Sequence, residues 1–223
     1  MFGGIVMESN YKVAYYNEWK TLQKRDFKKV KEIRNVTYDE DKNEFILKVF
    51  NREYILNCND ETIKRCDDNH IPSAETGVMF LNYLSFTECD IDKTDKWVSM
   101  KEIPNGGMMF YPAFYKSSIV NLIKAFGYDS SKLKKCAENL GGKEVNMGDA
   151  AFEFEVFPKA FCRVVIWEGD DEIKPSATIL FDSSIQYIMH VESIIGLGGY
   201  IINKIINELD KFEHIHSIIL NLD

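Results

Sequence analysis

Acidic side chains gather in the segment WEGDDEI and at the end of the strand pattern that follows it. Glu168, Asp170, Asp171 and Glu172 lie within five positions, and Asp182 ends the next alternating run. Carboxylate oxygens are the ligands that hard divalent cations prefer, and a pair of carboxyl groups can serve as general acid and base. The spacing of a helix-loop-helix calcium site is absent, so a solvated hairpin turn is the competing interpretation.

Thiol and imidazole groups offer weaker candidates. Seven residues separate Cys58 from Cys66, and three separate Cys66 from His70, whereas a zinc knuckle needs closely paired ligands such as C-x-x-C. Cys162 and His190 can form a nucleophilic pair only if the fold brings them together. The alternating pattern around Cys162 predicts instead that this thiol is a small core residue.

Aromatic and methionine side chains provide candidates for ligand contact. Trp167 precedes the acidic loop, Trp97 lies in WVSMKEI, and Met109 lies in PNGGMMFY at 104–111. We predict a loop at 104–111, because glycine lets a backbone approach a ligand closely and methionine adapts to its shape. The alternatives are an ordered loop that plugs its own core and tryptophans that only pack on a sheet.

Periodicity predicts the elements that position these residues. An amphipathic helix follows a cap at Asn10, a shorter one follows a cap at Asp26, and a largely buried one follows Pro72 and a cap at Ser73. Alternating patterns predict antiparallel strands over about 35–57 and 150–182. Further helices are predicted at 117–126, from Ser130 or Ser131 to Gly141, and from about 191, with the tail HIHSIILNLD either a last strand or a frayed end.

The hairpin at 150–167 has a predicted register. A three-residue turn between Phe157 and Phe161 would place Phe154 opposite Val164 and Glu155 opposite Arg163. Asp182 would then turn to the opposite face or to the strand end, within reach of solvent. The glycines at 196–199 follow a helical pattern rather than a strand, so they predict close packing or a helix break rather than a phosphate-binding loop.

Composition predicts an ordinary globular protein. The 223 residues carry 35 acidic and 27 basic side chains, giving a net charge of -8 that disfavours nucleic acid and anionic lipid as partners. No apolar run is long enough for a transmembrane helix, and the N-terminus does not resemble a signal peptide. With five widely spaced cysteines, we predict reduced thiols, cytoplasmic location and a single α+β domain over 1–223, built from antiparallel sheet and helices.

Several segments resemble a family of prokaryotic domains, mainly from anaerobic bacteria and archaea, catalogued as a domain of unknown function. The resembling pieces span most of 11–205: FLNYL, WVSMKEIPNGG with the following AF, LGG at 140–142, and FP, WEGDDEI and ILFDSSI toward the C-terminus. Some relatives look to be fused to, or encoded beside, iron-sulfur and corrinoid proteins of anaerobic one-carbon metabolism. The resemblance implies an accessory role near such cofactors and carries over no catalytic residue.

Three functional hypotheses follow. The leading one is a non-catalytic accessory domain that binds a small cofactor, of unknown identity, or a partner protein of anaerobic metabolism, through Trp97, Met109, Trp167 and the carboxylates Glu168, Asp170, Asp171 and Asp182. The second is a hydrolase or transferase assisted by a divalent cation, using the 168–172 loop with Asp182, His190 or Glu192. The third is a purely structural interaction module.

Overall fold

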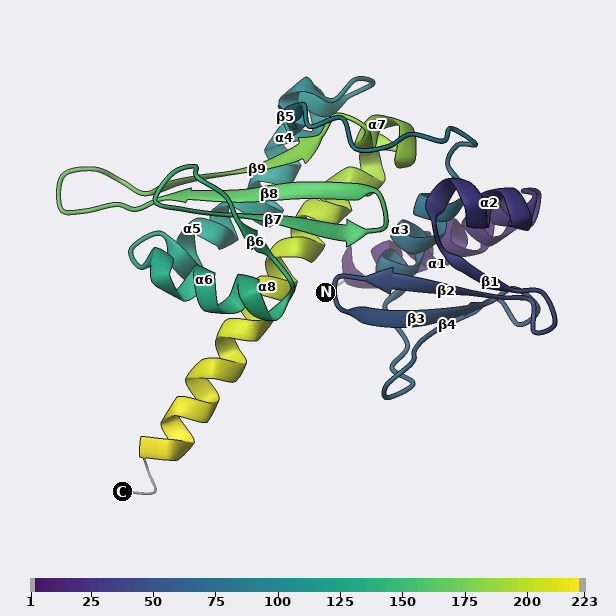
Figure 1. Ribbon diagram of the computed structural model, residues 1–223, viewed down its shortest axis with the longest axis horizontal. Coiled ribbons are helices and arrows are strands. Elements are labelled where there is room, and N and C mark those ends of the chain that lie inside the picture. Colours follow the sequence, from purple (N-terminus) through teal and green to yellow (C-terminus); the bar gives the residue numbers. More distant parts are fainter. Residues whose placement is uncertain (1–2, 221–223) are drawn as a thin grey trace.

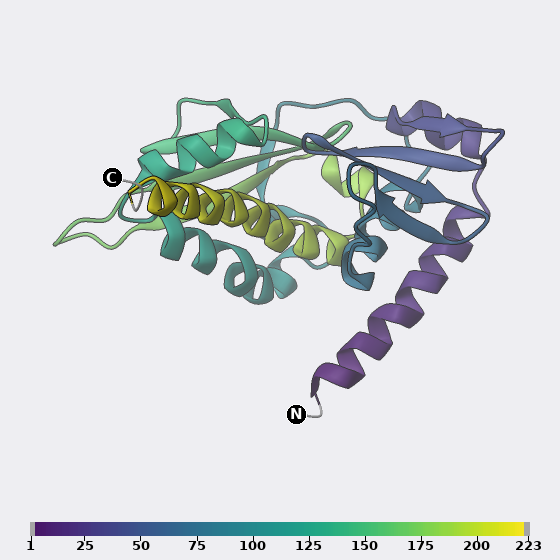
Figure 2. The same cartoon turned by 90° about the horizontal axis from the view of Figure 1, so that it is seen from below.

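The structure, a computed structural model, describes residues 3–220, with side chains described for 10–212 and 214. Two antiparallel sheets lie side by side and are packed against helices (Figure 1). Figure 2 shows both sheets toward one side of the molecule, with α8 and the run from α4 to α5 beneath the second sheet. The predicted α+β class and the two antiparallel stretches are confirmed, and the stretches form two separate sheets.

The helices account for most of the chain outside the sheets. In chain order they are α1 (Gly3–Leu22), α2 (Phe27–Arg34), α3 (Ala74–Ser85), the 3-10 helix η1 (Met100–Glu102), α4 (Gly107–Phe114), the π-helix η2 (Tyr115–Ile119), α5 (Val120–Phe126), α6 (Ser130–Asn139), α7 (Ile185–Ile188) and α8 (Val191–Leu220). None of the helices within 3–220 combines the length and apolar character needed to cross a bilayer.

The first sheet is a meander and the second has one non-sequential neighbour. The first has the order β1 (Thr37–Asp39), β2 (Glu44–Val49), β3 (Arg52–Asn57), β4 (Thr62–Arg65). The second has the order β5 (Trp97–Ser99), β9 (Ser176–Asp182), β8 (Ala160–Trp167), β7 (Ala150–Phe157), β6 (Lys143–Glu144). The first sheet therefore extends beyond the predicted end at residue 57. The sequence does not predict β4, because it lies in a charged segment without an alternation of apolar and polar residues.

Two of the predicted helix starts are confirmed by their caps. Asp26 accepts hydrogen bonds from the backbone amides of the first turn of α2, and the Ser73 hydroxyl accepts one from the Thr76 amide in α3. The predicted start at Asn10 is wrong, since α1 already begins at Gly3. Trp19 and Leu22, which belong to the predicted apolar face, do lie in the core.

The predicted register of the β7–β8 hairpin is wrong by two residues. Phe154 lies opposite Cys162, and Phe157 lies opposite Ala160, so the loop has two residues rather than three. Lys159 closes it with a left-handed φ of 65°, and an irregularity lies between Glu155 and Phe157. A shift of two residues keeps every side chain on its face, so the predicted buried face survived the error.

Glycine explains two further corrections. The prediction of a loop over 104–111 is wrong beyond Gly106, because α4 begins at Gly107, where an added Cβ would lie 2.1 Å from the Met100 carbonyl oxygen. The predicted break at 196–199 is absent, since α8 runs through it without interruption. Close packing is the correct alternative at Gly198, where a Cβ would lie 2.2 Å from the Phe114 ring. The possible last strand at the C-terminus is likewise helical as far as Leu220.

A single buried cluster of apolar side chains runs through both halves of the chain. At the junction, Phe50 adopts a left-handed φ of 53° and donates its amide to the Val156 carbonyl at 2.8 Å. Its ring contacts Phe154 edge to face and stacks with Tyr200 of α8. The tip of the β2–β3 hairpin is thus anchored between β7 and α8, although the single domain over 1–223 stays a prediction.

Candidate functional site

The acidic loop uses its carboxylates to organise its own surroundings. Glu168 accepts a hydrogen bond from the Ser130 amide at the start of α6, where a helix leaves amides unpaired. The Asp170 carboxylate accepts the amides of Glu172 and Ile173 at 2.8 and 2.7 Å. These bonds, from Ile173 first, lower the pKa of Asp170 below its usual value. Carboxylates that accept backbone amides of their own loop are typical of a solvated turn.

Asp182 does not join that loop. It lies at the far end of β9 opposite Trp97, whereas Trp167, which leads into the loop, lies opposite Ser176. Six residues at about 3.3 Å each put the two ends of β9 about 20 Å apart. Asp182 is also fully buried, which corrects the expectation that solvent can reach it. Within the described residues no three metal-ligating side chains come together.

The three predicted contact residues outside the carboxylates lie in different places. Trp167 is 40% exposed beside the acidic loop, and Met109 is 71% exposed on α4. The Trp97 ring is already covered by the Arg163 guanidinium, 3.9 Å from the ring centroid, and by Lys93 at 5.3 Å. Both cations therefore already lie over the Trp97 ring, where a stacked ligand would have to compete with them.

The sulfur-containing candidates are also dispersed. Cys58 is buried and Cys66 exposed, and burial raises the pKa of the Cys58 thiol to about 12. Cys162 is fully buried on β8, and burial raises its pKa further above that of an ordinary thiol. A buried, neutral thiol such as that of Cys162 is a poor nucleophile. His190, its proposed partner, is exposed and donates its backbone amide to the Asn82 side chain.

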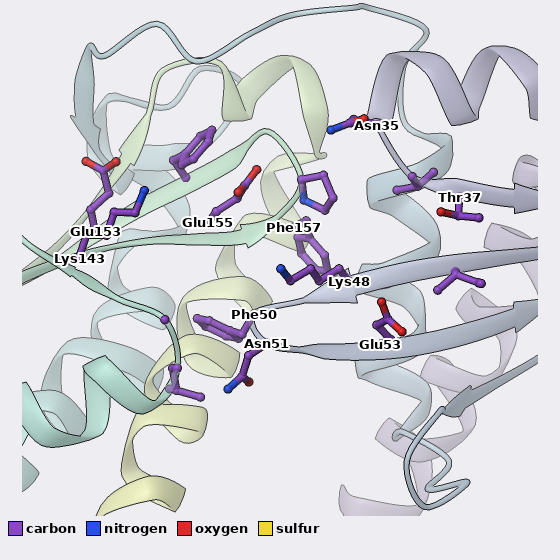
Figure 3. A pocket seen from close by; sticks show the side chains of 16 residues that line it. Asn35, Thr37, Lys48, Phe50, Asn51, Glu53, Lys143, Glu153, Glu155 and Phe157 are labelled. Atoms are coloured by element: carbon purple, nitrogen blue, oxygen red, sulfur yellow. The ribbon is translucent and has the colours of Figure 1, made fainter.

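A cavity between the two sheets has compensating charges. It has a volume of about 480 Å³, and Figure 3 shows side chains from both sheets around it. Lys48 lies directly opposite Glu53 across the β2–β3 pair. Glu153 accepts hydrogen bonds from Arg163 and Lys93. Because both lysine and glutamate side chains line it, this cavity favours no charge class of ligand.

A larger concavity is a groove among the helices, with a volume of about 1230 Å³. The contacts run from α1 to α3, from α3 to α8 and from α8 to α4, so α3 and α8 form the floor and α1 and α4 to α5 the walls. The apolar and small residues lining it include Ala14, Val78, Met79, Phe86, Ala113, Ile195, Gly196 and Gly199. We call this concavity the helical groove.

Polar groups converge at one point of the helical groove. The half-buried Glu18 carboxylate accepts a hydrogen bond from the Ser85 hydroxyl at 3.2 Å. Burial raises the pKa of Glu18, while hydrogen bonds from Ser85 and Asn82 and the nearby His190 act in the opposite direction. A carboxyl group with a raised pKa in an apolar concavity marks a candidate binding site.

The helical groove is also negatively charged. Glu18, Glu75 and Glu192 line it, and no lysine or arginine of the described residues does. Glu75 on α3 accepts a hydrogen bond from the Tyr11 hydroxyl on α1, so a polar contact links the two helices beside the groove. A ligand with a positive charge or several hydrogen-bond donors would therefore be favoured over an anion.

Sequence reasoning missed the central residues of the helical groove, although two signals were present. Glu18 lies beside Trp19 within the apolar half of a predicted helix, and Asn82 interrupts the apolar run of a helix predicted to be largely buried. A polar side chain at such a position needs a partner, which is the reason to ask what it faces. Of the carboxylate and imidazole side chains that line the groove, only His190 and Glu192 are candidates predicted from the sequence, both from the hypothesis of cation-assisted catalysis.

Comparison with known proteins is consistent with the resemblance noted in the sequence. No curated protein and no solved structure matches the chain. A protein family matches residues 26–204, which include α3 and the groove-lining part of α8 but not α1. The chain therefore belongs to the family described as a domain of unknown function (DUF3786).

Proposed function

We propose that the protein is a non-catalytic, cytoplasmic accessory module that binds a helical segment of a partner protein in the helical groove. The observation that supports this most is the shape of the groove: an open trough, about 1230 Å³ in volume, floored and walled by helices. This volume exceeds the roughly 300–1,000 Å³ typical of small-molecule pockets. An amphipathic helix laid in a hydrophobic groove is a common mode of recognition.

The length of the helical groove fits such a segment. Lining residues extend from Tyr11 to Thr21 on α1 and from Glu192 to Asn203 on α8. At 1.5 Å per residue these stretches are about 15 and 17 Å long, enough for a partner helix of about three turns. Small residues on the floor, Gly196 and Gly199, would let its backbone approach closely.

The central polar group suggests what the partner carries. Glu18 lies on one wall, and its desolvation would be relieved by a lysine or arginine side chain entering from an apolar helix face. The proposed partner segment is thus amphipathic, with a basic residue near its centre. That the partner belongs to anaerobic metabolism is a further part of this proposal and rests on the family resemblance alone.

The catalytic hypothesis has less support. Its residues lie in three places: the acidic loop, the buried end of β9 at Asp182, and the groove at His190 and Glu192. General acid-base chemistry or cation binding needs these groups within reach of one reacting atom.

Selection from a library of helical peptides tests the proposal. The selection uses the wild-type chain and counter-selects against Gly196→Leu, which fills the groove where an added Cβ meets open space. We expect wild-type-specific peptides that are amphipathic and carry a central basic residue, and we expect Glu18→Gln to weaken them by about tenfold. Asn207→Leu, on the same helix but outside the groove, is the matched control. Peptides that bind Gly196→Leu as well as wild type would contradict the proposal.

A further inference from the structure

A smaller cavity lies where the β2–β3 hairpin tip and the end of β4 meet α8. Its volume is about 280 Å³, and its lining comes from parts of the chain more than a hundred positions apart. Four of the lining residues are cationic: Arg52, Arg65, Lys204 and Lys211. Glu208 is the acidic residue in this lining. In a protein with a net charge of -8, a lining with more cationic than acidic side chains is a local exception.

Three of the four cations are matched by carboxylates. The Arg52 guanidinium lies 2.6 Å from Asp67, and the Arg65 Nε lies 2.7 Å from the same carboxylate. Lys211 pairs with Glu208 at 2.5 Å, one turn along α8. Arg65 also pairs with Asp68 through Nε and Nη2. Of the five N–H donors that each guanidinium carries, this leaves Nη1 of Arg65 and Nε and Nη2 of Arg52 without a carboxylate partner among the described residues.

Lys204 differs from the other three. It is partly buried, and its ammonium group lies 5.0 Å from the centre of the Tyr200 ring. Among the residues that the structure describes, no carboxylate forms an ion pair with Lys204. Glu208 is the acidic residue whose charge acts on it, but the Glu208 carboxylate pairs with Lys211 and accepts a hydrogen bond from the Asn139 side chain. A lysine in this position is partly desolvated without a counter-charge in contact.

The surroundings of Lys204 act against its charge. Burial lowers the pKa of Lys204, and the positive charges of Arg65, Arg52 and Lys211 lower it further, opposed only by Glu208. The neighbouring Tyr200 hydroxyl is itself buried, which raises its pKa and keeps it neutral. Groups that repel one another at a cavity wall are stabilised when an anion enters between them.

We propose that this cavity binds a small anion, a phosphate or carboxylate group, with Lys204 as its principal contact and the two arginines as flanking donors. The inference does not rest on the function proposed for the helical groove, which takes the opposite charge. Both groups present anionic oxygens, in a plane in a carboxylate and as a tetrahedron in a phosphate, and lysine and arginine donate hydrogen bonds to either. The two sources are separated by experiment.

Titration of the full-length chain at low ionic strength tests the site, with inorganic phosphate, pyrophosphate and succinate as separate probes. Calorimetry gives Kd, and thermal unfolding gives the stabilisation by each anion. We expect saturable binding of at least one probe, weakened by added salt. We expect Lys204→Met to weaken binding by about tenfold or more and to abolish the anion-dependent rise in Tm, while Lys204→Arg retains most of it.

Lys64→Met is the matched control, because it removes the same charge from the neighbouring position on β4, whose side chain points to the opposite face from Arg65. We expect it to change Kd by less than about twofold. Circular dichroism confirms that each variant is folded. Binding of succinate but of neither phosphate probe would identify the ligand as a carboxylate. Binding of the phosphate probes but not of succinate would identify it as a phosphate. Equal weakening by both methionine variants, or no saturable binding of any probe by wild type, would overturn the proposal.

Discussion

Replacing Asp182 separates a structural carboxylate from a catalytic one. Asp182 is fully buried at the end of β9. Its Oδ1 accepts hydrogen bonds from the Thr94 amide at 3.0 Å, the Thr94 hydroxyl at 2.9 Å and the Ser184 amide at 3.0 Å. It therefore fastens the segment leading into β5 to the turn that follows β9, and we predict that Asp182→Ala destabilises the protein.

The expected magnitude follows from the donors left without an acceptor. A buried unsatisfied donor costs about 1–3 kcal/mol. Thr94 is exposed, so water can reach its two donors, and the cost for each lies at the lower end of this range. Ser184 is fully buried, so the cost for its amide lies at the upper end. The free energy of unfolding should fall by about 3–5 kcal/mol. Asp182→Asn keeps an oxygen acceptor and loses only the charge, so about 1–2 kcal/mol is expected.

Urea denaturation and thermal unfolding measure these changes. A chain of this size loses about 2–4 °C in Tm per kcal/mol, so Asp182→Ala should unfold about 6–20 °C lower. Burial raises the pKa of Asp182, but hydrogen bonds from Ser184 and Thr94 outweigh burial and hold the pKa below its usual value. The carboxylate therefore stabilises the fold above about pH 4, and this stabilisation disappears as pH falls through the lowered pKa.

Asp171→Ala is the control, because Asp171 is an exposed aspartate in the acidic loop. It should change the free energy of unfolding by no more than about 0.5 kcal/mol. If Asp182→Ala were as stable as this control, the structural role would be refuted. The same conclusion would follow if the difference between wild type and Asp182→Ala stayed constant below pH 4.

Two further predictions concern the glycines of α8 and the thiols. Gly196→Ala should stabilise the protein by up to about 1 kcal/mol, because an alanine side chain there meets open space. Gly198→Ala should destabilise it by about 1–3 kcal/mol, because its Cβ would lie 2.2 Å from the Phe114 ring. Thermal unfolding measures both changes, and a shift of Tm in the same direction for the two variants would contradict the prediction. A thiol reagent should modify Cys66 and Cys89 rapidly in the native protein, and react only after denaturation with the three buried thiols, Cys58, Cys136 and Cys162; fast modification of all five would show that the core opens readily.

The sequence predicted local structure well where one physical signal dominates. Asp26 and Ser73 cap helices as their side-chain chemistry requires, and the alternation around Cys162 identified the buried face of β8. It failed where two signals compete. Glycines at 104–111 suggested a loop, yet Gly107 is needed because η1 packs too closely for a side chain, and the register of the β7–β8 hairpin depended on a turn whose length alternation does not encode.

The sequence by itself determined the fold class, the starts of several helices, the approximate positions of the two strand groups and the sign of the overall charge, because periodicity, caps and composition act over a few residues or over the whole chain. Only the tertiary structure decided which side chains meet. It placed Asp182 about 20 Å from the acidic loop along β9. It also joined Glu18 to Ser85 and Asn82 in one groove and set Lys204 beside Arg52 and Arg65 in another cavity. These contacts link residues tens to more than a hundred positions apart, and their distances depend on how helices and sheets pack, which no local pattern records.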